Sequence, residues 1–174
     1  EMVATVRRFH AVFDRLAALP AVTLAEIAGA ALGGGLELAL ACDLRIAAHE
    51  ARLGLPEAKV GLLPGAGGTQ RLTRLCGPGV AARLILTGEL IDGREAAHLG
   101  LAQWSVPADA LDAAAGALAS RAAALSPQAV RAAKGCIAVA AALAPAGVRA
   151  EVDGIGALML AHDTRRRIDA FLAR

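Results

Sequence analysis

Two glutamates stand in sequence contexts that local secondary structure does not explain. Glu37 follows the glycines at 33–35 at an apparent helix start, and Glu57 follows Pro56, which fixes the local backbone. A carboxylate on an apolar stretch beside exposed backbone N–H groups is uncommon, because glutamate is seldom buried without a partner. Together the two glutamates indicate paired acid/base chemistry.

Two close carboxylates in an apolar pocket disfavour double ionisation, so at least one of them holds its proton more tightly than an isolated glutamate. Their titration then belongs to the pair, and proton exchange near neutral pH becomes available for catalysis. Each glutamate taken alone has an equally good structural interpretation. Glu37 fits a solvated helix residue, and Glu57 fits a helix-start carboxylate favoured by the helix dipole.

The glycine run at 33–35 also supports two interpretations. The structural one is a turn that lets two backbones approach closely. The functional one is an oxyanion site, because glycines ahead of a helix leave N–H donors unpaired and unshielded by side chains. A phosphate or dinucleotide loop is disfavoured, because neither GxGxxG nor GxxxxGK[ST] occurs at this run or at the second glycine loop, 64–69.

No second catalytic constellation is visible in the sequence. The serines lack a GxSxG context, which argues against a serine hydrolase, and the histidines show no HExxH or paired spacing. The three cysteines have no CxxC spacing, which argues against a disulfide framework or a zinc site and fits a reducing compartment. Metal catalysis therefore has no support in the sequence.

Composition predicts one soluble globular domain. The chain has 174 residues, of which 56% are hydrophobic and 20% charged, so it is too apolar for disorder. The longest uncharged stretch, 135–148, contains Pro145 and is too short to span a bilayer. Net charge is +2, and no basic block is interleaved with aromatic residues, so neither nucleic acid nor a membrane is an expected partner.

Alternating short apolar runs and helical patterns carry the two glutamates. The pattern predicts a helix over 3–19, a strand over 22–27, a glycine-rich turn over 29–35, a short helix over 36–41 and a strand over 44–48. A further short strand is expected over 52–55 and a single helical turn over 56–61. The second glycine loop then leads into a helix that continues through Leu75.

The second half of the chain becomes almost entirely helical. A helix is expected over 78–86, a capping box at 92–95 begins a helix that ends at Gly100, and 101–106 reads as a strand. Beyond Pro107 the pattern predicts alanine-rich helices over 109–125, 127–143 behind Ser126, 146–161, and 164–173 behind Asp163. The chain thus divides into an α/β core, 1–106, and a helical region, 107–174.

Several separate motifs, in this order and spacing, resemble the enoyl-CoA hydratase (crotonase) family. They are ALGGGLELALACD at 31–43, GLPE at 54–57, LPGAGGTQRL at 63–72, LTG at 86–88, AAHLGL at 96–101 and AF at 170–171. The resemblance covers essentially the whole sequence. It implies an α/β crotonase-like spiral of ββα units, followed by a helical oligomerisation region that builds homotrimers, often paired into hexamers.

The resemblance also implies a reaction. The thioester carbonyl of an acyl-CoA would sit in an oxyanion hole of two backbone N–H groups, one of them from Gly34, each donor contributing roughly 3 kcal/mol. Glu37 and Glu57 would hold a water and add it syn across the 2,3 double bond of a 2-enoyl-CoA. Retention of both glutamates favours hydration over isomerisation, decarboxylation or hydrolysis. No separate cofactor is expected, since coenzyme A is part of the substrate.

Four further residues take expected roles from the resemblance. The N–H of Gly65 would orient the water or Glu57, or the glycine simply permits tight packing. Phe171 and Arg174 would contact coenzyme A, although a positive charge at Arg174 equally complements a helix C-terminus. Glu26 departs from the small residue expected in its strand, and we expect it to face solvent.

The family has a further block before the first helix of this sequence, with early strands, the adenine-binding region and the second oxyanion donor. The N-terminal part of the fold is therefore expected to lie outside residues 1–174. With that block the protein would be an active hydratase; without it, an inactive acyl-CoA-binding or oligomerisation module, and a family isomerase is a further alternative. The Ala, Gly and Arg bias favours a bacterial cytoplasm, with the mitochondrial matrix as the alternative.

Overall fold

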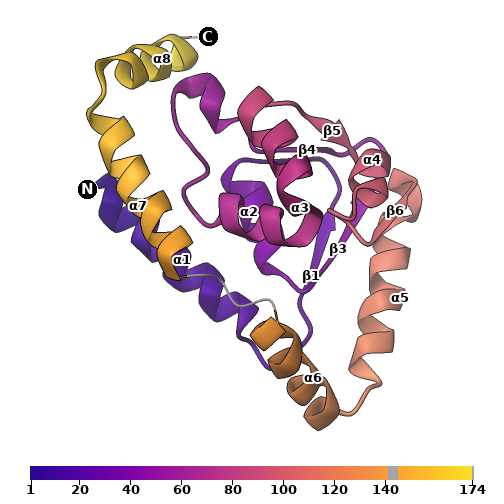
Figure 1. The fold of residues 1–174 in the computed structure, drawn as a ribbon. Helices are drawn as coiled ribbons and strands as arrows, with labels where there is room; N and C mark the ends of the chain where they lie inside the picture. The colour runs from indigo at the N-terminus through magenta and orange to yellow at the C-terminus, as the bar shows by residue number, and fades with distance from the viewer. Residues whose placement is uncertain (141–144, 174) are drawn as a thin grey trace.

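The computed structural model describes residues 1–140 and 145–173 and contains two three-stranded sheets (Figure 1). The first sheet is parallel, in the order β1 (Leu24–Ile27), β3 (Leu44–Ala48), β6 (Trp104–Val106). The second has the order β2 (Ala30–Leu32), β4 (Arg52–Gly54), β5 (Ile91–Asp92), with β2 parallel and β5 antiparallel to β4.

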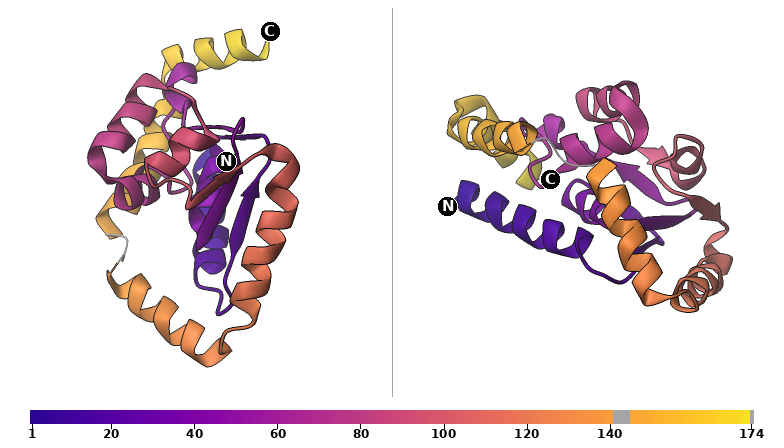
Figure 2. Two further views of the ribbon diagram at one scale, coloured as in Figure 1. Left: turned by 90° about the vertical axis from the view of Figure 1, so that its right-hand side faces the viewer. Right: turned by 60° about the horizontal axis from the view of Figure 1, so that its bottom comes forward.

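Helices connect and cover these strands. They are α1 (Met2–Ala17), α2 (Gly34–Ala41), α3 (Gly68–Thr87), α4 (Gly93–His98), α5 (Leu111–Ala123), α6 (Pro127–Ala140), α7 (Pro145–Leu160) and α8 (His162–Leu172), with short 3₁₀ helices η1 (Glu57–Val60) and η2 (Ala108–Ala110). In the left view of Figure 2, α5 runs along one side of the parallel strands and α3 lies on the other. The sheet is therefore covered on both faces, as parallel sheets require.

The main core lies between the parallel sheet, α2 and α3. Ile46, Leu53 and Leu72 are fully buried there, and each such aliphatic side chain stabilises the fold by about 1.5–3 kcal/mol. One charged side chain interrupts this core. The guanidinium of Arg45 is buried and donates to the carbonyl oxygens of Leu101, Ala39 and Cys42 at 2.8, 3.2 and 2.7 Å, which ties the end of α2 to the sheet.

The glycine-rich region before α2 differs from the prediction of a continuous turn over 29–35. Residues 30–32 form strand β2, which pairs with β4, and α2 begins at Gly34 rather than at residue 36. Extended pairing satisfies the backbone polar groups of this segment, which an unpaired turn would leave to solvent. The strand therefore ends directly before the glycines at which the helix starts.

The segment from 68 to 106 keeps the predicted elements with altered bounds. α3 contains the two helices expected on either side of Gly77, which separates them with a non-helical φ of 81° and ψ of 164° ahead of Pro78. The N-cap half of the predicted capping box is confirmed, because Asp92 Oδ1 accepts from the N–H of Glu95 at 2.8 Å, whereas Glu95 Oε1 pairs with Arg83 Nη1 at 2.7 Å. Strand β5 was not predicted, and the strand expected over 101–106 forms ladder pairs only over 104–106.

The helical region folds back onto the core. α7 runs alongside α1 (Figure 1), and Val152 and Ile155 bury against Val6 there. Helix α6 is anchored by Lys134, whose Nζ lies 2.6 Å from Asp43 Oδ2. Although a cap was predicted at Asp163, α8 begins at His162 with Ala161 as its N-cap, because the chain is still extended at residue 161. The predicted cap at Ser126 accepts a 3.4 Å hydrogen bond from Ala129 N.

Candidate active site

Glu37 is placed by the junction between β2 and α2. The N–H of Gly33 pairs with Gly54 O at 3.0 Å and continues the strand ladder, and Gly33 then turns the chain with φ of 54° and ψ of −125°. This positive φ suits glycine and disfavours any side chain. The helix begins one residue later, which puts Glu37 in its first turn with only 3% of its surface exposed.

The second glycine loop holds the Glu37 carboxylate. Glu37 Oε1 accepts hydrogen bonds from the N–H groups of Ala66 at 2.7 Å and Gly68 at 2.8 Å. Gly67 is left-handed, with φ of 102°, and α3 starts at Gly68, so its unpaired N–H donors and its dipole point at the carboxylate. Backbone donors of this kind favour the ionised form of a carboxyl group.

Glu57 has the opposite environment. It follows Pro56 and opens the 3₁₀ helix η1, where it is half-buried, and its Oε2 is buried without a hydrogen-bond partner in the described chain. The pKa of Glu57 is raised from its ordinary 4.5 to about 7, mainly by burial; the Glu37 charge adds to the rise and a hydrogen bond from its own backbone opposes it. Glu57 therefore keeps its proton close to neutral pH.

The two glutamates converge on the start of α2. A Cβ built on Gly33 would lie 3.1 Å from Glu57 Oε1, so this glycine makes room for the second carboxyl group beside the helix that carries Glu37. Gly34 and Gly35 are exposed, and a Cβ on either would meet no atom within 4 Å. Since the first N–H groups of a helix have no partner within it, the exposed start of α2 offers hydrogen-bond donors near the two glutamates.

The chain matches the family model described as Enoyl-CoA hydratase/isomerase over residues 4–173. The chain belongs to the enoyl-CoA hydratase/isomerase family. The crotonase-like α/β fold with a helical C-terminal region is thereby confirmed. Its similarity extends to solved structures, including a putative enoyl-CoA hydratase from Streptomyces avermitilis, with a TM-score of 0.90 and 37% identity over 95% of this chain and 60% of that one.

Similar proteins of the hydratase/isomerase family come from bacteria and mitochondria. The probable enoyl-CoA hydratase echA8 of Mycobacterium tuberculosis is 50% identical over 126 residues, which are 72% of this chain and 49% of that protein. The mitochondrial methylglutaconyl-CoA hydratase of Homo sapiens is 52% identical over 96 residues, which are 55% of this chain and 28% of that protein. The chain thus spans about half the length of the mycobacterial relative.

The structure places the remaining predicted site residues of the hydratase/isomerase chain as follows. Gly65 packs against α7, where a Cβ would lie 3.0 Å from Ile155 Cγ1, and its catalytic role stays a prediction. Phe171 is on α8 and 61% exposed, while Arg174 lies outside the described residues, so contact of either with coenzyme A stays a prediction. Glu26 is exposed on β1, as expected.

Sequence reasoning missed Ala66 and Gly68, whose N–H groups donate to Glu37. The signal was present, because the glycines at 67 and 68 precede a helix just as those at 33–35 do. Both runs therefore place helix-start N–H groups, and those at the start of α3 include the Gly68 donor to Glu37 Oε1. What the sequence did not reveal is that the second helix start faces the side chain carried by the first.

Other candidate sites are not supported by the described residues. In residues 1–140 and 145–173, no group of three or more His, Cys, Asp or Glu side chains is arranged to hold a metal ion. None of the described helices combines the length and apolarity needed to cross a bilayer. The three cysteines are free.

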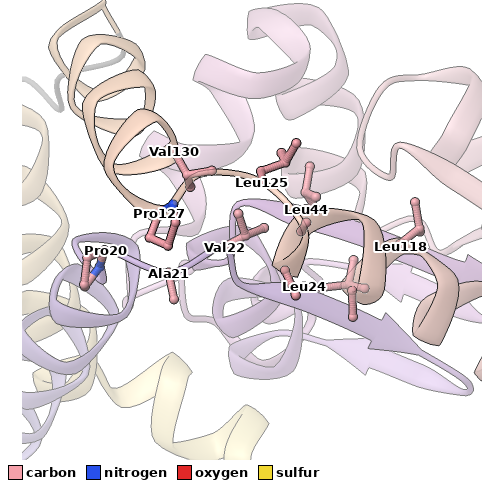
Figure 3. Close-up of a pocket in the computed structure, with 12 residues that line it drawn as sticks. Pro20, Ala21, Val22, Leu24, Leu44, Leu118, Leu125, Pro127 and Val130 are labelled. Carbon is pink, nitrogen blue, oxygen red and sulfur yellow. The ribbon is translucent and has the colours of Figure 1, made fainter.

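A cavity of about 260 Å³ lies apart from the two glutamates (Figure 3). It is lined by Pro20 and Val22 in the α1–β1 connection, by Leu44, the first residue of β3, by Leu125 in the α5–α6 connection and by Val130 on α6. Leu44 follows the C-terminal end of α2, whereas Glu37 lies in the first turn of that helix. Because the lining side chains are all apolar, the cavity offers no group that would orient a polar substrate.

Proposed function

We propose that this chain carries the active site of an enoyl-CoA hydratase, a lyase that adds water syn across the 2,3 double bond of a 2-enoyl-CoA thioester. The observation that carries the proposal is the contrast between two neighbouring glutamates. Glu37 is held by two backbone N–H donors, whereas burial leaves Glu57 with a pKa of about 7. A carboxylate and a carboxylic acid side by side are the base and the acid that hydration needs.

The environments of the two glutamates suit different steps. Glu37, held by the N–H groups of Ala66 and Gly68, accepts a proton from the water as the water oxygen bonds to C3. The electron pair of the double bond moves toward the thioester, and Glu57 gives its proton to C2. The product gains one water, and transfer of the proton from Glu37 to Glu57 restores the starting state.

The thioester oxygen carries negative charge during this addition, and the N–H of Gly34 is the proposed donor to it. Support comes from the exposure of Gly34 at the start of α2 and from the open space around it. Donors that are already fixed in place cost no reorganisation when the charge develops, so each contributes roughly 3 kcal/mol. The second donor of the oxyanion hole is proposed to come from a segment preceding the first helix.

Turnover of crotonyl-CoA and longer 2-enoyl-CoAs tests the proposal, followed as loss of the conjugated thioester absorbance. We expect Glu37→Gln and Glu57→Gln each to lower kcat by roughly 10²–10⁴-fold, the usual contribution of a positioned acid or base. Glu89→Gln is the matched control, because Glu89 pairs with Arg83 on the surface. Undiminished turnover in the Glu37→Gln, Glu57→Gln double variant would refute the mechanism.

Acyl-CoA binding without turnover is the second candidate function. Tight binding of an acyl-CoA by a protein that does not hydrate any enoyl-CoA would support it. Movement of the double bond of a 3-enoyl-CoA, without hydration, would instead identify the isomerase that the family description includes.

The assembly and compartment are proposed from the resemblance and the composition. We expect a homotrimer or a pair of trimers, built through the helical region, and light scattering of the purified protein measures this directly. The proposed compartment is the bacterial cytoplasm, because the composition is rich in Ala, Gly and Arg. The mitochondrial matrix is the alternative, since the methylglutaconyl-CoA hydratase it resembles is mitochondrial.

A further inference from the structure

Arg71 folds back over the turn that holds Glu37. The backbone N–H of Arg71 donates to Gly67 O at 2.8 Å, which is the first i to i−4 hydrogen bond of α3. Its side chain lies back along the turn, where Nη1 donates to Ala66 O at 3.0 Å. Only 9% of the side chain is exposed. A Cβ on Gly67 would collide with Nη1, so the guanidinium lies directly against the turn.

This contact acts on the same residues that hold the carboxylate. Both backbone polar groups of Ala66 are hydrogen-bonded here: its N–H donates to Glu37 Oε1, and its carbonyl oxygen accepts from Arg71 Nη1. The next donor to Glu37, Gly68, is two residues further along the same turn. Rotation of the turn about the left-handed Gly67 would misdirect both donors at once, and the guanidinium opposes that rotation.

The other end of the guanidinium is fixed by a different helix. Arg71 Nη2 lies 2.6 Å from Asp14 Oδ1 on α1, and this carboxylate is about half exposed. The planar fork of arginine donates to a carbonyl and a carboxylate from two nitrogens in one fixed geometry. A lysine would offer one nitrogen and could not hold both acceptors in the same way.

We propose that Arg71 is a positioning residue of the glutamate pair: clamped by Asp14, it fixes the turn at 66–68 so that two N–H groups stay directed at Glu37. Arg71 acts through this turn and does not touch the substrate. The inference rests on the proposed function only for its effect on turnover. The geometry of the turn can be measured without any substrate.

Amide hydrogen exchange of the protein, read by NMR at Ala66 and Gly68, tests the inference directly. In Arg71→Met we expect exchange at both amides to accelerate roughly tenfold or more, because hydrogen bonds to a charged carboxylate are lost or weakened. In Arg71→Lys, which keeps the charge but not the fork, we expect both amides to accelerate as well. Arg83→Met is the matched control, because Arg83 is an ion-paired arginine of the same helix that contacts Glu89 and Glu95.

The same variants predict a split in the kinetic constants. We expect kcat to fall roughly tenfold or more in Arg71→Met, with KM for crotonyl-CoA within about twofold of the wild type, because only groups acting on the reaction are displaced. Unchanged exchange at Ala66 and Gly68 in a folded Arg71→Met or Arg71→Lys protein would overturn the inference. Absence of turnover in the wild type would instead refute the proposed function, and the exchange measurement would still stand.

Discussion

Replacing Glu57 with glutamine is expected to make the protein more stable at alkaline pH. The carboxyl group is half-buried, and its pKa is raised from 4.5 to about 7, first by burial and then by the charge of Glu37. Glutamine has nearly the same shape and carries no charge at any pH. The variant therefore removes the cost of an ionised carboxylate at this position and leaves the packing of η1 in place.

The sign and size of the effect follow from proton linkage. Below pH 4.5 the carboxyl group is protonated in both the folded and the unfolded chain, so it makes no difference to stability. Between pH 4.5 and 7 the unfolded chain loses this proton first, and the folded state is progressively destabilised. The full pKa change corresponds to roughly 3 kcal/mol, which solvent screening of the part-exposed group reduces to about 1–2 kcal/mol.

Urea unfolding of the wild type and of Glu57→Gln between pH 4 and pH 8.5 measures this difference. We expect the two free energies of unfolding to be close near pH 4, to separate as the pH rises, and to differ by about 1–2 kcal/mol above pH 7. Glu89→Gln is the control, because the pKa of the exposed Glu89 is lowered by its hydrogen bond with Arg83 and its replacement gives no such gain. A pH-independent difference for Glu57→Gln would refute the reasoning.

Two further substitutions test the backbone around the pair. Gly33→Ala puts a side chain at φ of 54° with its Cβ 3.1 Å from Glu57 Oε1. We expect the free energy of unfolding, measured with urea, to fall by about 1–2 kcal/mol and kcat to fall as well. An unchanged urea midpoint would contradict this. Thr164→Val removes the 2.9 Å hydrogen bond from buried Thr164 Oγ1 to Gly61 O, just after η1. We expect a loss of about 1–2 kcal/mol that Thr164→Ser, which keeps the hydroxyl, does not show; equal urea midpoints for Val and Ser would count against it.

The elements that surround the glutamates could be predicted because their signals are local. Apolar spacing indicated α1, the apolar run 44–48 coincides with β3, and Asp92 caps the helix start that was expected at 92–95. Strand β2 was missed because three residues next to glycines carry no periodic signal, and their extended form depends on pairing with β4. Short strands acquire their conformation from partners that are distant in the sequence.

The candidate site shows the same division. Residue types and glycine context were sufficient to select Glu37 and Glu57, and the order of the motifs was sufficient to indicate the family that the comparisons confirm. Gly34 was selected only through the resemblance to that family. The donors at Ala66 and Gly68 were not predicted, because they reach Glu37 across about thirty residues of sequence. A hydrogen bond of that range depends on how two helices pack, and the sequence pattern of either helix does not contain it.

The sequence by itself determined that two carboxylates and a glycine-led helix start are present in this protein. Only the tertiary structure decided that the carboxylates differ. Glu37 accepts hydrogen bonds from the N–H groups of Ala66 and Gly68 at the start of α3, whereas Glu57 is half-buried with one oxygen that has no hydrogen-bond partner in the described chain. The physical reason is that the protonation of a carboxyl group depends on the donors and the water that reach it, and these are set by packing between distant segments.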